Sequence, residues 1–276
     1  MRRAGIAAVL LCATLLLAAC DKVETRPVVV VSVEPQAFFV ERIAGDRVDV
    51  QVMIPPGGSP HTFEPSMSQM KEISAAAAWI KIGHPDLVFE GDWHDRFVAA
   101  NPDMEIVTGC DGVAFQHHDP HVWVSPRAAA TLARRSGDVL MRALPEHADE
   151  FTGNLEALLE EIEQLDRELE ARLEPYRGRR FLVFHPAWGY LAERYGLVQT
   201  AIEEGEKEPS PKQLAELVEL ARSEHLRTVF VQPQMVEHSA QVVAQDIGGE
   251  VVAIDPLARN WSENLPEVVD RLIESF

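Results

Sequence analysis

A repeated alternation of short β-branched runs with helical segments is the feature that most restricts how this chain can fold. Residues 28–33, VVVVSV, run without polar alternation, which is typical of a strand buried on both faces of a parallel sheet. Comparable runs recur at 48–54, 77–82 and 105–107, and then again at 181–184, 197–202, 228–231 and 251–254. Segments with helical patterning separate them. We therefore predict an α/β fold of two doubly wound lobes, each built on a central, mostly parallel four-stranded sheet.

One long segment separates the two series of strands. From Glu146 to Pro175 there is no internal proline, and apolar residues recur at three-and-four spacing: Leu155, Leu158, Leu159, Ile162, Leu165, Leu169 and Leu173. This pattern predicts a single helix, about 45 Å long at about 1.5 Å per residue, that joins the lobes. A helix that pairs with a second chain in a coiled coil is the alternative. We accordingly expect an N-terminal lobe at 28–145, a linking helix at 146–175 and a C-terminal lobe at 176–276.

The first twenty residues have the features of an export signal. Arg2 and Arg3 precede an apolar run, Ala4–Ala19, that is too short to span a bilayer comfortably. The sequence Leu-Ala-Ala-Cys ending at Cys20 resembles the bacterial lipoprotein box. It implies cleavage after residue 19, acylation of Cys20, and a lipid-anchored tether at 20–27 on the outer side of the cytoplasmic membrane. A plain cleaved signal with an incidental cysteine is the alternative.

Composition excludes several classes of function. A formal net charge of −19 repels phosphate backbones, so we expect no nucleic-acid partner. The same charge suits a cationic ligand. Of the three cysteines, Cys12 lies in the signal and Cys20 is the lipidation site, which leaves Cys110 without a partner for an internal disulfide.

Three histidines and one aspartate fall just beyond the carboxyl ends of predicted strands, which is where ligands bind in doubly wound sheets. They are His61, His121, His185 and Asp255, two from each half, and each has a proline beside it. Imidazole and carboxylate groups suit Zn²⁺, which takes four ligands at about 2.0–2.2 Å. Adjacent prolines restrict the backbone and reduce the freedom lost when a ligand is fixed. The pattern predicts one metal site between the lobes.

Five separated motifs extend this pattern: PGGSPHTFEP at 56–65, DPHVWVSP at 119–126, FHPAWGY at 184–190, EPSP at 208–211 and IDPL at 254–257. Together they resemble the zinc and manganese solute-binding lipoproteins of bacterial ABC importers. The resemblance covers essentially the whole chain after Cys20. It implies two α/β lobes joined by one backbone helix, with the metal held between them by His61, His121, His185 and Asp255. It also implies delivery to the membrane subunit and the ATPase of an ABC permease, by a monomer without enzymatic activity.

The metal can be inferred from the third ligand. In this family, histidine at the position of His185 is typical of zinc-binding members and glutamate of manganese-binding ones, so zinc is favoured over Mn²⁺. Zinc-binding members often carry a long histidine-rich loop, whereas this chain has only Gln116-His117-His118-Asp119. We expect His117 and His118 to form at most a weak accessory metal site.

Alternatives remain open at this point. An exported mononuclear zinc hydrolase would need Asp255 or Glu64 to act as a base near a metal-bound water. A manganese- or iron-binding member of the same importer family is another alternative, and a surface adhesin has no sequence mark of its own. His84 and His94 are candidates for partners of the ligand imidazoles, but we expect exposed or capping roles for both. We expect a solvated loop for the acidic run of Glu203, Glu204, Glu206 and Glu208.

Overall fold

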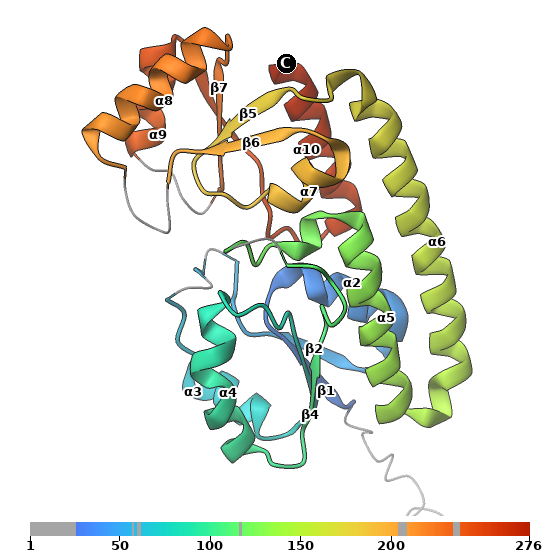
Figure 1. Cartoon of the computed structure of the whole chain (residues 1–276). Coiled ribbons are helices and arrows are strands. Elements are labelled where there is room, and N and C mark those ends of the chain that lie inside the picture. The colour runs from blue at the N-terminus through green and yellow to red at the C-terminus, as the bar shows by residue number, and fades with distance from the viewer. Residues whose placement is uncertain (1–25, 57, 60–61, 116–117, 204–208, 234–237) are drawn as a thin grey trace, which may run out of the picture.

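A computed structural model describes residues 26–276, with the exception of 57, 60–61, 116–117, 204–208 and 234–237. Two separate sheets of four parallel strands form the centres of the two lobes (Figure 1). The first contains β1 (Val28–Val31), β2 (Asp49–Val52), β3 (Ala76–Lys81) and β4 (Glu105–Thr108) in the order β2-β1-β3-β4. The second contains β5 (Arg180–Val183), β6 (Val198–Ala201), β7 (Thr228–Val231) and β8 (Glu250–Ala253) in the order β6-β5-β7-β8. The predicted α/β fold with two doubly wound lobes is confirmed, and the pairing between these strands is parallel throughout.

Helices flank both sheets. In the N-terminal lobe they are α2 (Glu34–Ala44), α3 (Met67–Ile73), α4 (Val88–Ala100) and α5 (Pro126–Ala143). In the C-terminal lobe they are α7 (Gly189–Tyr195), α8 (Pro211–Ser223), α9 (His238–Ile247) and α10 (Trp261–Ser275). Ser66 and Ser210 cap α3 and α8 by accepting the backbone N–H three residues on, as serine at a helix start commonly does.

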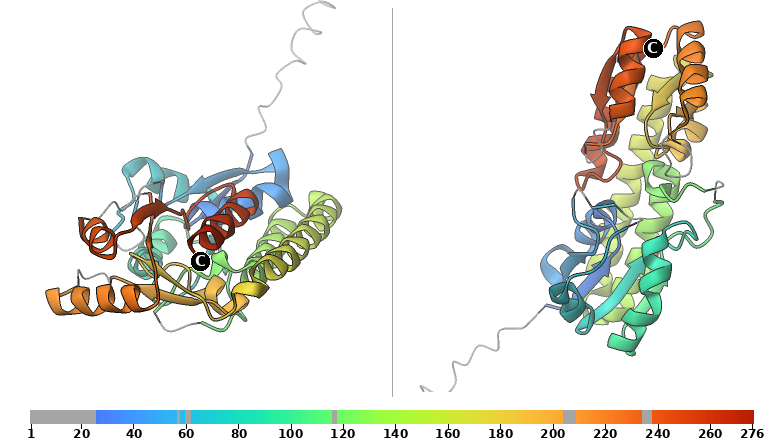
Figure 2. Two further views of the ribbon diagram at one scale, coloured as in Figure 1. Left: turned by 90° about the horizontal axis from the view of Figure 1, so that it is seen from above. Right: turned by 90° about the vertical axis from the view of Figure 1, so that its left-hand side faces the viewer.

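The long helix α6 (Ala148–Leu173) lies alongside both lobes (Figures 1 and 2). It is slightly shorter than predicted, because 3₁₀ turns occupy Pro145–His147 and Glu174–Tyr176. All of its buried side chains except Phe151 belong to the expected apolar stripe. The helix packs against α2 and α5 on one lobe and α7 and α10 on the other. The stripe is therefore covered by the protein itself, as a linking helix requires.

A single apolar core extends across the junction between the lobes. Phe39 of α2 and Trp261 of α10 meet edge to face at 5.2 Å between ring centroids. Two tryptophans hydrogen-bond across the same junction: Trp123 donates from Nε1 to the Pro256 carbonyl at 2.6 Å, and Trp261 donates from Nε1 to the Trp123 carbonyl at 2.7 Å. A second, smaller core is confined to the outer part of the C-terminal lobe, around β7, α8 and α9.

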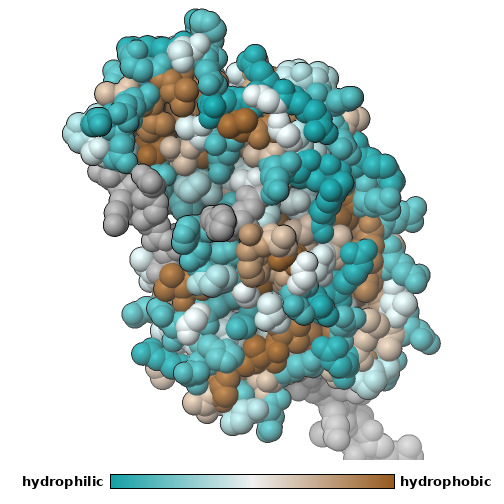
Figure 3. All heavy atoms as spheres, in the orientation of Figure 1, coloured by the Kyte–Doolittle hydropathy of each residue, from teal (hydrophilic) through white to brown (hydrophobic). Residues whose placement is uncertain are grey.

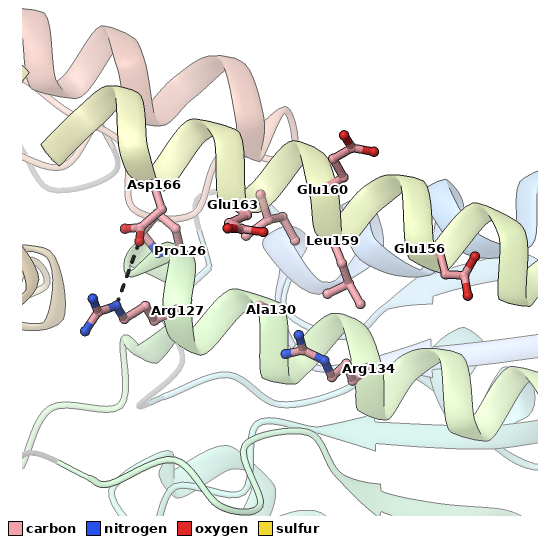
Figure 4. A pocket seen from close by; sticks show the side chains of 10 residues that line it. Pro126, Arg127, Ala130, Arg134, Glu156, Leu159, Glu160, Glu163 and Asp166 are labelled. Atoms are coloured by element: carbon pink, nitrogen blue, oxygen red, sulfur yellow. Dashed lines mark ion pairs between the residues drawn. The ribbon is translucent and has the colours of Figure 1, made fainter. Parts of the chain in front are cut away.

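The outer surface is largely polar. Hydrophilic side chains cover much of the face shown in Figure 3. Within the described residues, none of the helices has the length and apolar character needed to cross a bilayer. A groove of 430 Å³ lies between α5 and α6, where arginines from one helix face carboxylates of the other (Figure 4). None of the predicted metal ligands that the structure describes lines it.

Candidate metal centre

The N-terminal lobe contributes a buried imidazole that is fixed by its own loop. His121 is 4% exposed and lies at the start of a 3₁₀ turn, Val122–Val124, on the path from β4 to α5. The Asp119 Oδ1 atom accepts from the backbone N–H of His121 at 2.9 Å and lies 2.8 Å from its Nδ1. A carboxylate only accepts, so Nδ1 carries the proton and Nε2 is the nitrogen with the lone pair. This is the tautomer that a metal ligand needs.

Burial sets the protonation of His121. It lowers the pKa of the ring because the charged form loses its hydration, and Asp119 opposes this by hydrogen bonding and by its charge. The ring is therefore neutral at neutral pH and ready to bind a cation. Asp119 is itself 8% exposed, so its carboxylate is held in place with the imidazole rather than solvated.

The C-terminal lobe contributes a second buried imidazole whose partner comes from another strand. His185, 9% exposed, follows the end of β5, and its Nδ1 lies 3.0 Å from Glu203 Oε2. Glu203 follows the end of the neighbouring strand β6, and its backbone N–H donates to the Phe184 carbonyl at 3.0 Å. Parallel pairing of β5 with β6 thus places the two side chains together.

This contact corrects one expectation from the sequence. Glu203 is 7% exposed, so it does not lie in a solvated loop. Its burial next to His185 orients the ring and leaves Nε2 as the deprotonated nitrogen. The rest of the acidic run, Glu204, Glu206 and Glu208, lies outside the described residues.

The two imidazoles face each other between the lobes. The ring centroids of His121 and His185 are 5.2 Å apart, with an angle of 79° between the ring planes. Two imidazoles on one tetrahedral zinc, with Zn–N bonds of about 2.0–2.1 Å, have their centroids about 5 Å apart. The spacing between the rings therefore fits one shared ion.

Of the other two predicted ligands, Asp255 is described by the structure and His61 is not. Asp255 is half-buried after β8, and its Oδ1 accepts from the Leu257 N–H at 2.9 Å. The adjacent Pro256 carbonyl is the acceptor for Trp123 Nε1, so the Asp255 loop touches the His121 loop. His61 lies outside the described residues. Within the described part of the chain, no three metal-binding side chains are close enough to share an ion.

The remaining histidines are not part of this pair. The His118 side chain is 90% exposed, and its Nδ1 lies 3.1 Å from Asp86 Oδ2. His117 and Cys20 lie outside the described residues. His94 is on α4, beside Trp79 at 6.2 Å between ring centroids. His84 is 4% exposed, which corrects the expectation of an exposed role.

Sequence reasoning missed both carboxylates that orient the ligand imidazoles. Asp119 could have been found, because it stands two residues before His121 with only a proline between them. Glu203 had no such signal, because it is 18 residues from His185 and only the pairing of β5 with β6 brings them together.

Comparison with known proteins places the chain among zinc-uptake components. Residues 29–275 match the family model described as "Zinc-uptake complex component A periplasmic". A zinc-binding lipoprotein, AdcA, of Streptococcus pneumoniae is 27% identical over 278 residues, which cover 93% of this chain and 56% of that protein. A crystal structure of ZnuA matches with a TM-score of 0.86 and 36% identity, and the match covers 91% of this chain and 99% of the ZnuA chain. A ZnuA deletion mutant with zinc bound has a TM-score of 0.85 and 36% identity, covering 91% of this chain and 98% of that one.

Proposed function

Because this chain belongs to the family of periplasmic zinc-uptake components, we propose that it captures Zn²⁺ between its two lobes and delivers the ion to an ABC-type permease. The single observation that carries this proposal is the pair of buried imidazoles, one from each lobe, with ring centroids 5.2 Å apart. A carboxylate lies against Nδ1 of each ring, which leaves Nε2 as the metal-binding atom. The partners would be the membrane subunit of the permease and its ATPase.

The proposed ligand set is His61, His121, His185 and Asp255. It draws two ligands from the N-terminal lobe, 28–145, and two from the C-terminal lobe, 176–276, with the segment 146–175 between them. Four protein ligands close the coordination shell of zinc and leave no position for a reacting water. This arrangement favours a carrier over a hydrolase, so we propose no enzymatic activity.

The donor set favours zinc over manganese and iron. Imidazole nitrogen is softer than carboxylate oxygen and prefers Zn²⁺ to the harder Mn²⁺. The similarity to AdcA, which is named as zinc-binding, supports the same choice. His117 and His118 would add at most a weak accessory site, and the exposed His118 beside Asp86 is the only member of that pair among the described residues.

We further propose that the protein works as a monomer anchored outside the cytoplasmic membrane through lipid on Cys20. The sequence Leu-Ala-Ala-Cys at 17–20 supports the anchor, and the similar AdcA protein is a lipoprotein. Because the chain spans 56% of the length of AdcA, the full activity of that protein is not transferred to this one.

Native mass spectrometry with elemental analysis tests the function directly. The protein, purified without added metal and then titrated with Zn²⁺, should bind one zinc ion tightly, and Mn²⁺ in equal amount should not displace it. A His185→Ala variant should lose that ion. His225→Asn removes an exposed imidazole that precedes the amino end of β7, at the opposite edge of the sheet from the proposed ligands, and should keep it. The proposal would be contradicted if His185→Ala kept its zinc, or if the protein bound manganese more tightly than zinc.

A further inference from the structure

A third buried histidine follows the carboxyl end of a strand in the N-terminal sheet. In the first sheet, the order β2-β1-β3-β4 reverses direction between β1 and β3, and ligands bind outside the carboxyl ends of strands at such a reversal. His84 follows β3 directly, three residues after its last residue, Lys81. It is 4% exposed. Its place in the fold is therefore equivalent to that of the proposed ligands, although none of the sequence motifs includes it.

The turn that carries His84 is rigid. The buried carboxylate of Glu90 accepts from the backbone N–H groups of Ile82 at 2.6 Å and Gly83 at 2.7 Å. Gly83 has a φ of 84°, and a Cβ atom there would lie 2.2 Å from Cγ2 of Thr108, so only glycine fits. Two backbone bonds and a sterically closed glycine thus fix the direction in which the His84 side chain leaves the sheet.

The ring of His84 has a defined tautomer. Its Nδ1 accepts the backbone N–H of Asp86 at 3.1 Å, so in the neutral ring the proton is on Nε2. Phe115 packs against the ring edge to face, with 4.5 Å between centroids. The Nε2 atom is buried and has no hydrogen-bond partner among the residues that the structure describes. A buried N–H without an acceptor is costly, so a rigid turn that holds one in a ligand crevice indicates that the acceptor arrives with the ligand.

The turn that carries His84 also lies against the loop that leads to His121. Phe115 of that loop packs on the His84 ring, and Nδ1 of His118 in the same loop lies 3.1 Å from Asp86 Oδ2. Direct coordination of the metal by His84 is not favoured, because Nε2 carries the proton and Nδ1 is already used by Asp86. The group that His84 presents to the crevice is a hydrogen-bond donor.

We propose that His84 donates a hydrogen bond from Nε2 to an oxygen atom bound to the captured zinc, and so acts as a positioning residue for the metal. The inference rests on the proposed zinc site. The oxygen is that of the Asp255 carboxylate, which is the oxygen donor in the proposed ligand set. His84 would hold this oxygen ligand in place and slow its exchange, as groups that hydrogen-bond to metal ligands do.

Two substitutions separate this role from a merely structural one. His84→Asn keeps an acceptor near the position of Nδ1 for the Asp86 N–H but has no donor at the position of Nε2. His84→Gln keeps a donor near Nε2 and loses the acceptor at Nδ1. We expect His84→Asn to weaken zinc binding about tenfold, the effect of one lost hydrogen bond, and His84→Gln to stay close to the native affinity. If the ring serves only to satisfy Asp86, the order of the two variants is reversed, which overturns the inference.

Zinc affinity is measured by competition with a chelator, and Co²⁺ substitution gives a second readout through the visible absorption of the bound ion. The Co²⁺ spectrum should change in His84→Asn and stay native in His84→Gln. His94→Asn is the matched control, because His94 also has a buried nitrogen without a partner but lies on α4. Native affinity and a native spectrum in His84→Asn overturn the inference, whereas failure of the unsubstituted protein to bind zinc would instead overturn the proposed function.

The acceptor is tested by adding His84→Asn to an Asp255→Ala background. If His84 donates to Asp255, the second substitution has no further effect on zinc affinity, which supports the inference. A further tenfold loss in the double variant, or a gain in affinity, shows that His84 acts independently of Asp255 and overturns it.

Discussion

The two halves of the candidate metal centre are alike in chemistry and different in construction. Each lobe supplies a buried histidine with a carboxylate against Nδ1, at 2.8 Å in the N-terminal lobe and 3.0 Å in the C-terminal lobe. In the first half, Asp119 and His121 belong to one short loop. In the second, His185 and Glu203 come from the ends of two neighbouring strands, β5 and β6. The same ligand geometry is thus reached once by a local turn and once by strand pairing.

This difference has a physical consequence for each half. Asp119 fixes the backbone as well as the ring, since its Oδ1 also accepts the N–H of His121. Among the described residues, the Glu203 side chain is hydrogen-bonded to the ring of His185, and its backbone is fixed by the sheet. We therefore expect loss of the Asp119 carboxylate to weaken both zinc binding and the stability of the metal-free protein. Loss of the Glu203 carboxylate should weaken mainly zinc binding.

The largest effect should come from removing either imidazole. His121→Ala and His185→Ala should each lower zinc affinity by about a hundredfold or more, because a direct ligand contributes more than the groups that orient it, which cost about 10–100-fold when lost. Chelator competition measures both variants under one set of conditions. Losses of similar size indicate one ion shared by the two halves.

The control for these variants is His225→Asn, an exposed imidazole in the C-terminal lobe at a φ of 59°, a conformation that asparagine tolerates well. Its zinc affinity should stay native. If one ligand variant loses zinc and the other binds it normally, the two rings do not share an ion, and the comparison between halves loses its basis.

A smaller effect should come from removing the carboxylates. Asp119→Ala and Glu203→Ala should each weaken zinc binding by about 10–100-fold, because each ring loses the acceptor that fixes its tautomer and orientation. In the metal-free protein, Asp119→Ala should also lower the melting temperature further than Glu203→Ala, since it removes a backbone contact worth about 1 kcal/mol as well. Calorimetry of both apo variants tests this. Equal melting temperatures would show that removing the Asp119 carboxylate destabilises the metal-free protein no more than removing the Glu203 carboxylate.

Much of the fold could be predicted because its signals are local. Runs such as 28–31 are apolar on both faces, and this marks a strand between two helical layers. The apolar stripe of α6 marks a long buried face. The ends of α6 were less predictable, since a 3₁₀ turn and an α-helix place side chains in similar patterns over three residues.

The candidate site was predictable only in part. Strand-end position identifies His121 and His185, because the carboxyl ends of parallel strands gather at one edge. Position along the chain cannot show that Glu203 is buried beside His185. Nor can it show that Nε2 of His84 is buried without a partner among the described residues. Those contacts depend on strand neighbours and on the packing of a turn, which no spacing in the sequence records.

The smallest predicted effect is a pH dependence that belongs to the N-terminal half. Burial lowers the pKa of His121 in the folded protein, against the Asp119 contact that raises it, so the unfolded chain takes up a proton at a higher pH than the folded one. The apo protein should therefore lose stability as pH falls through about 6.5 toward the lowered pKa, and level off below it. Melting temperatures of the metal-free protein between pH 7.5 and pH 5 measure the slope.

A His121→Gln variant should show a shallower slope over the same range, because glutamine does not take up a proton. Zinc adds stability at pH 7.5 because it binds the folded state and needs a neutral imidazole. Acid releases the metal, so the melting temperature of the zinc-loaded protein should fall more steeply with pH than that of the metal-free protein. His225→Asn should reproduce the native slope. If His121→Gln has the native slope as well, burial of the ring does not set its protonation, and the loop-built half has no advantage in presenting a neutral ligand.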